Sequence, residues 1–233
     1  MQTHQKLYAQ GIHLYTMSGI VFSFLATLAL INQDIRLFLV SLFVAVIVDA
    51  TDGTLARKFA ISEIYPHFNG AKLDDLIDYL TYVFLPCMGL IQFNILHSGW
   101  EWMAVVPMLA SLYGFCQENA KTEESFVGFP SYWNIVFLYL YVLEISSQLS
   151  ILTLLVFSLL IFVPVHYVYP TKTRFMKRTT ITLSTLYAAA MAVVCLFPHA
   201  KGIHLPALIS LIYPVYYMLI SLIHHFRITH QPA

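Results

Sequence analysis

Residues 49–78 read DATDGTLARKFAISEIYPHFNGAKLDDLID, and they are unlike the apolar sequence on either side. The stretch holds four spaced aspartates, namely Asp49, Asp52, Asp74 and Asp78. Residues three or four positions apart lie on one face of a helix, so each pair of these aspartates is expected to share a face. Two such faces brought together form a cluster of four carboxylates.

A carboxylate cluster at the end of apolar helices requires neutralisation, because its members repel one another and lose hydration. Mg²⁺ and Mn²⁺ suit such a cluster, since both take oxygen ligands and also bind phosphate oxygens. Gly53 and Gly70 allow the backbone to approach a ligand closely, and Arg57 offers a fork of donors to a phosphate. Asp75 lies off the shared face, so we leave it out of the predicted site.

The surrounding composition is that of an integral membrane protein. Hydrophobic residues make up 59% of the 233 residues and charged residues only 10%, whereas soluble domains carry about 25% charged residues. The formal net charge is zero, which gives no indication of a nucleic-acid partner. Cys87, Cys116 and Cys195 stand apart in apolar runs, as buried cysteines commonly do.

The apolar segments predict an all-α polytopic membrane helix bundle that forms one domain over residues 1–233, with about eight transmembrane helices of roughly 20 residues each. The predicted crossings are residues 12–31, 36–52, 74–96, 101–117, 132–146, 148–169, 180–198 and 204–225. The crossing at 132–146 has the shortest apolar stretch, and a tilted or re-entrant segment is the alternative there. Residues 1–11 are expected to form a helix that lies on the membrane.

The basic residues predict the orientation of the bundle. With a cytoplasmic N-terminus, ten of the twelve lysines and arginines fall on the inside, and only Arg36 and Lys201 fall outside. Because cytoplasmic loops carry an excess of basic residues, this orientation is favoured over its inverse. Both termini and the acidic stretch then face the cytoplasm.

The acidic stretch resembles the signature of the CDP-alcohol phosphatidyltransferases, in the order Asp49-x2-Asp52-Gly53-x2-Ala56-Arg57 and Gly70-x3-Asp74-x3-Asp78. Twelve residues separate Arg57 from Gly70, which is more than is usual in that family. The longer gap and its ending, Pro66-x-Phe68-x-Gly70, are similar to the bacterial branch of the family that uses choline. The run from Phe115 to Asn134 and residues 166–170 resemble the same branch.

The resemblance implies an enzyme that transfers the phosphatidyl group of CDP-diacylglycerol to the hydroxyl of choline and releases CMP. It implies two Mn²⁺ or Mg²⁺ ions, held by Asp49, Asp52, Asp74 and Asp78, with Asp78 also as general base. The residues implied to bind CDP and its phosphates are Asp52, Gly53, Ala56, Arg57, Gly70 and Asp74. A homodimer in the bacterial cytoplasmic membrane, in contact with membrane lipid, is also implied.

Choline is a quaternary ammonium, which proteins hold with aromatic faces and nearby carboxylates. The candidates near the acidic stretch and on the loop before the fifth crossing are Tyr79, Tyr82, Glu118, Glu123, Tyr132, Trp133 and Asn134. Lys172 and Arg174 belong to the densest basic cluster and are candidates for binding the lipid phosphate, although anchoring at the membrane surface explains them equally well.

Two alternative functions use the same residues differently. Phosphatidylserine and phosphatidylinositol synthases share the metal and CDP site but recognise a carboxylate or a polyol. A cation transporter also places carboxylates within membrane helices, but it does not account for the positions of Gly53 and Arg57.

Overall fold

The computed structural model describes residues 2–59, 61–64, 67–122 and 124–230, and it confirms the all-α fold class. The first two helices, α1 (Gln2–Met17) and α2 (Gly19–Ile31), follow one another almost without interruption. A short turn then leads into α3 (Ile35–Lys58), whose first turn is capped by Asp34, because this side chain accepts a hydrogen bond from the Leu37 N–H at 2.9 Å. The C-terminal half of α3 carries the first pair of aspartates.

The second pair of aspartates lies on a long helical rod that changes its winding. After α4 (Ile61–Ile64), the rod consists of α5 (Gly70–Asp78), the π-helical segment η1 (Tyr79–Phe84) and α6 (Leu85–Gln92). Asn69 caps its start by accepting from the Lys72 N–H at 2.9 Å. Since Pro86 has no N–H, the regular α-helical bond to residue 82 is missing, and a π segment accommodates the break.

The central helices are short. They are η2 (Glu101–Ala104), α7 (Val105–Phe115), α8 (Trp133–Val142) and α9 (Ser147–Ile161). The ten residues of α8 span about 15 Å, roughly half the hydrocarbon thickness.

The predicted crossing at 148–169 is wrong in its second half. Helix α9 ends at Ile161, and Pro164 follows shortly after, which disfavours continued helix. Instead β2 (His166–Val168) pairs antiparallel with β1 (Ser125–Val127), with Phe126 opposite Tyr167. We did not predict these strands, because three residues are too few to produce a recognisable alternation.

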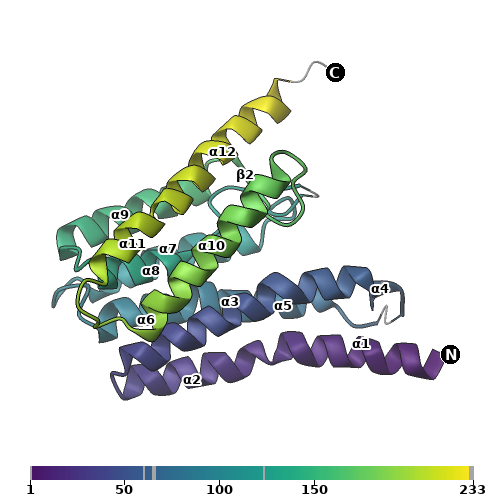
Figure 1. Cartoon of the computed structure of the whole chain (residues 1–233), viewed down its shortest axis with the longest axis horizontal. Coiled ribbons are helices and arrows are strands. Elements are labelled where there is room, and N and C mark those ends of the chain that lie inside the picture. Colours follow the sequence, from purple (N-terminus) through teal and green to yellow (C-terminus); the bar gives the residue numbers. More distant parts are fainter. Residues whose placement is uncertain (1, 60, 65–66, 123, 231–233) are drawn as a thin grey trace.

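The last helices enclose the central ones. They are α10 (Lys177–Leu196), α11 (His204–Ser210) and α12 (Ile212–Thr229). Figure 1 shows α3 between α2 and α10, which contact it from opposite sides. Strand β2 is fixed to α12 by Val168, which donates its N–H to Ser221 Oγ at 3.1 Å and accepts from the Tyr217 hydroxyl at 3.0 Å.

Three helical stretches of the described residues are long and apolar enough to cross a membrane, namely Leu7–Ile31, Lys177–Leu196 and His204–Thr229. Two shorter apolar helices are Trp133–Val142 and Ser147–Ile161. The chain is therefore a membrane protein, while the number of crossings remains a prediction. Residues 2–11 are helical as the first part of the longer helix α1, and their position on the membrane surface stays a prediction.

Candidate functional site

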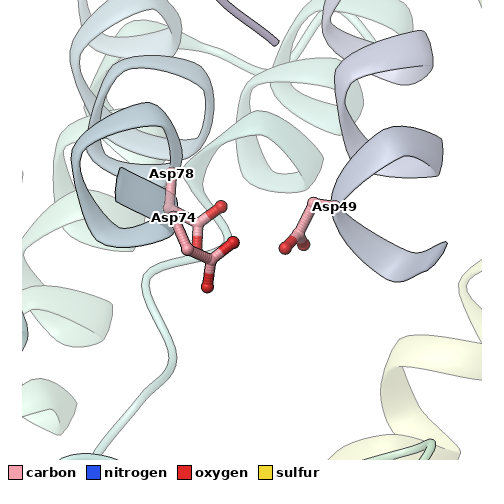
Figure 2. Close-up of side chains that lie close together, drawn as sticks. All are labelled: Asp49, Asp74 and Asp78. Carbon is pink, nitrogen blue, oxygen red and sulfur yellow. The ribbon is translucent and has the colours of Figure 1, made fainter. Parts of the chain in front are cut away.

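The acidic centre consists of Asp49, Asp74 and Asp78, which come from two different helices. One carboxylate oxygen from each lies within 4.8 Å of the other two. Figure 2 shows Asp49 reaching from α3 toward Asp74 and Asp78 on α5. Three converging carboxylates fit a hard divalent cation, because Mg²⁺ and Mn²⁺ prefer oxygen ligands.

Asp52 lies beside the acidic centre without joining it. It is 5% exposed, and it shares a small internal cavity with the three clustered aspartates and Thr16 from α1. The Tyr82 hydroxyl donates a hydrogen bond to Asp49 Oδ2 at 2.6 Å, which fixes the orientation of that carboxylate. The predicted set of four aspartates is therefore resolved into three close carboxylates and one buried neighbour.

A cavity of about 620 Å³ opens next to the acidic centre. On α3, its lining follows one helical face from Leu39 through Val46 and Asp49 to Arg57, a length of about 27 Å. The half toward Leu39 is apolar, and the half toward Arg57 is polar. The cavity therefore suits an amphipathic molecule with a charged head and an apolar tail.

Lys121 faces the acidic centre from the loop after α7. Its ammonium donates to Asp75 Oδ1 at 2.7 Å and lies 3.6 Å from Asp74 Oδ2 and 3.9 Å from Asp78 Oδ2. Burial alone would lower the pKa of Lys121, but these three carboxylates raise it above its usual range. The side chain therefore carries a positive charge at neutral pH.

The predicted CDP-binding residues occupy two different environments. Gly53 and Arg57 line the large cavity, and Arg57 Nη2 donates to Thr54 Oγ1 at 3.2 Å. Ala56 and Gly70 are not among the residues that line it. A Cβ at Gly70 would lie 3.2 Å from the His13 ring, so this glycine also permits close packing of α1 on α5.

Three of the predicted choline residues, Tyr82, Tyr132 and Asn134, line the cavity. Two others do not, which corrects their expected placement. Tyr79 donates to the Met108 carbonyl at 3.2 Å, and Trp133 is buried with its Nε1–H bonded to Ser111 Oγ at 2.7 Å.

The acidic choline candidates on the loop and the two basic candidates for the lipid phosphate have different surroundings. Glu118 is exposed and is not among the lining residues, and Glu123 lies outside the described residues. The Lys172 ammonium lies 4.2 Å from the centre of the Tyr169 ring, and burial lowers its pKa, with further lowering from Arg57 and Lys121. Arg174 instead pairs with Glu124 at 3.5 Å and is 92% exposed.

Several residues that line the cavity were not predicted as site residues from the sequence, namely Lys121, Tyr169, Tyr213 and Tyr217. The ring centre of Tyr132 lies 6.0 Å from that of Tyr82 and 6.0 Å from that of Tyr217. These residues come from η1, the residue before α8, and α12, so no spacing along the chain links them. The sequence shows only that tyrosines are abundant in the chain.

Comparison with known proteins agrees with the geometry. The family model for CDP-alcohol phosphatidyltransferase matches residues 13–212 of this chain. The matched region includes all four signature aspartates and most of the cavity lining. The chain belongs to this family, and it is a membrane-embedded phosphatidyltransferase.

The relatives narrow the class further. The chain is 41% identical over 171 residues to a phosphatidylcholine synthase of Pseudomonas aeruginosa, a match that covers 72% of each protein. It is 37% identical over 190 residues to a phosphatidylcholine synthase of Legionella bozemanae, covering 77% of this chain and 87% of that relative. Membership of the family sets aside the alternative of a cation transporter.

Proposed function

We propose that this chain transfers the phosphatidyl group of CDP-diacylglycerol to choline and forms phosphatidylcholine and CMP. The observation that carries the proposal is the convergence of Asp49, Asp74 and Asp78 at the polar part of a cavity whose other part is apolar. A lipid with a diphosphate head matches this division. The names of the relatives favour choline over serine or inositol as the acceptor.

Two Mn²⁺ or Mg²⁺ ions are proposed as cofactors, with Asp49, Asp74 and Asp78 as ligands and Asp52 completing the set from its buried position. Bound ions would stabilise the charge that develops on the attacked phosphate and on the departing CMP. Arg57 lines the same cavity and would donate to the diphosphate. Gly53 leaves space beside Arg57. Ala56 and Gly70 are kept as proposed CDP-binding residues on the family resemblance alone.

Asp78 is proposed as the general base. The choline oxygen forms a bond to the phosphorus that carries diacylglycerol, and the bond from that phosphorus to the CMP oxygen breaks. The hydroxyl proton passes to the Asp78 carboxylate, and the electron pair leaves with CMP. A positioned carboxylate is needed because an alcohol is a poor nucleophile at neutral pH.

The acceptor is proposed to bind among tyrosines near the acidic centre. Tyr82, Tyr132 and Tyr217 line the cavity with neighbouring rings, and Asp49 lies at the Tyr82 hydroxyl. Aromatic faces attract a quaternary ammonium, and the carboxylates add charge complementarity. Lys172, stacked on Tyr169, is proposed to face the lipid phosphate, whereas the ion pair with Glu124 weakens the case for Arg174.

The protein is proposed to lie in the bacterial cytoplasmic membrane as a homodimer, with the site toward the cytoplasm. The orientation is supported by the ten of twelve basic residues that a cytoplasmic N-terminus places inside. The dimer is proposed from the family resemblance.

The test is CMP release by the purified full chain with CDP-diacylglycerol and Mn²⁺. Choline is compared with serine, with inositol and with 3,3-dimethylbutan-1-ol, which has the shape of choline without its charge. Release with choline alone is the expected result. Release with serine or inositol but not with choline would replace the proposed acceptor, and release with the neutral analogue at the same KM would exclude recognition of the charge.

A further inference from the structure

The ammonium of Lys121 contacts the acidic centre in a way that the proposed reaction does not use. It lies 3.6 Å from Asp74 and 3.9 Å from Asp78, which are two of the three carboxylates of the acidic centre. It also lies 2.7 Å from Asp75, which is not one of the three clustered carboxylates. A cation supplied by the chain itself therefore stands where the charge of a divalent ion would act.

The position of Lys121 is set by backbone hydrogen bonds of the loop that follows α7. Val127 donates its N–H to the Ala120 carbonyl at 2.9 Å, and Lys121 forms a backbone bridge with Phe126. The Thr122 hydroxyl donates to the Ser125 carbonyl at 2.9 Å. Strand β1 pairs with β2, which is bonded in turn to α12. The ammonium is thus brought to α5 by a separate, anchored element.

Asp75 gives the ammonium a second place of attachment. Asp75 and Lys121 have nearly equal side-chain exposure, 38% and 39%, whereas Asp78 is only 13% exposed. The carboxylate closest to the ammonium is that of Asp75, which is not a proposed metal ligand. Lys121 can give up its longer contacts with Asp74 and Asp78 and keep its hydrogen bond to Asp75.

We propose that Lys121 is a positioning residue that acts as an internal counter-ion of the acidic centre and competes with the divalent cation for it. The inference rests on the proposed metal site. Without a metal ion, the ammonium offsets the repulsion among the carboxylates. With a metal ion bound, the ammonium stays on Asp75 and lowers the affinity for the metal by like-charge repulsion.

The test compares Lys121→Met, which removes the charge, with Lys121→Arg, which keeps it. The full chain is titrated with Mn²⁺ in the absence of substrate, and free Mn²⁺ is followed by electron paramagnetic resonance. The Kd of Lys121→Met is expected to fall about tenfold, equivalent to about 1.4 kcal/mol, and the Kd of Lys121→Arg to stay close to that of the wild type. Lys72→Met is the matched control, since Lys72 is exposed on α5.

Thermal unfolding in a chelator gives a second readout. Lys121→Met is expected to melt below the wild type without metal and to gain more from added Mn²⁺, because only the metal can then neutralise the cluster. Lys121→Gln carries the same expectations should the methionine variant not fold. An unchanged or weaker Mn²⁺ affinity in the neutral variants would overturn the inference alone. A wild-type chain that binds no Mn²⁺ would overturn the proposed metal site and this inference together.

Discussion

The three clustered aspartates have unequal surroundings. The Asp49 carboxylate already accepts a hydrogen bond from Tyr82 at 2.6 Å, and Asp74 is more exposed than Asp78, at 31% against 13% of the side chain. A hydrogen-bonded or solvated carboxylate is a weaker base than a shielded one. These differences support the choice of Asp78 as the group that takes the proton.

Asp78→Asn is expected to lower kcat by about 10²–10⁴-fold, since the amide cannot accept the hydroxyl proton. Binding of CDP-diacylglycerol should be largely retained, which equilibrium binding of a labelled lipid will measure. Asp34→Asn is the control, because asparagine caps a helix as well as aspartate does. Near-normal turnover by Asp78→Asn would contradict the role of base.

Tyr132→Leu is expected to raise the KM for choline by about tenfold, since a cation–π contact is worth roughly 0.5–2 kcal/mol. Tyr132→Phe keeps the ring and should retain most of the affinity. The measurement is the KM for choline at saturating CDP-diacylglycerol. Equal KM values for the leucine and phenylalanine variants would show that the ring does not contact the ammonium.

Among the elements, α2 and α5 make one unusually close contact. A Cβ added at Gly19 would lie 2.5 Å from Ile77 Cγ2, so a glycine is required for the two helices to approach as they do. Ile77 directly precedes Asp78 in the chain. The distance between α2 and α5 therefore influences where the proposed base lies.

Gly19→Ala is expected to destabilise the protein by about 1–3 kcal/mol through overpacking and to lower activity by moving α5. Adding Ile77→Ala should recover part of both losses, because it removes the clashing methyl group. Thermal melts and CMP release measure the two effects. Gly11→Ala, which meets no atom within 4 Å, is the matched control and should not destabilise α1. A Gly19→Ala variant as stable as this control would contradict the contact.

At the scale of the whole molecule, the cavity is lined by residues from many elements, including α3, α8, α9, α10 and α12. Its apolar part is lined by Met191 and Cys195 from α10 and by Leu39 and Leu42 from α3. This part has the chemistry of an acyl-chain site. The polar and apolar parts of the substrate would thus be held by opposite ends of α3.

Ala188→Phe is expected to reduce activity more strongly with long-chain than with short-chain CDP-diacylglycerol, because Ala188 lines the cavity. Ala189→Phe is the control, since Ala189 is exposed on the outside of α10. The measurement is the ratio of kcat/KM for the two lipids. An equal loss with both lipids would place the acyl chains elsewhere.

The sequence by itself determined the membrane class, the helical fold and the signature aspartates, because apolar length and helical spacing are local properties. It also determined the family, since the residues from Asp49 to Asp78 have the order of the family signature. The sequence wrongly suggested that Tyr79 and Trp133 line the cavity. Tyr79 begins the π segment, and Trp133 is bonded to Ser111.

Only the tertiary structure decided which side chains surround the acidic centre. It separated Asp52 from the three close carboxylates and brought Lys121 and Tyr217 to the cavity from distant positions. Such contacts depend on how helices pack and on a loop fixed by two short strands. Because packing joins residues without regard to their spacing in the chain, no local pattern in the sequence could have predicted them.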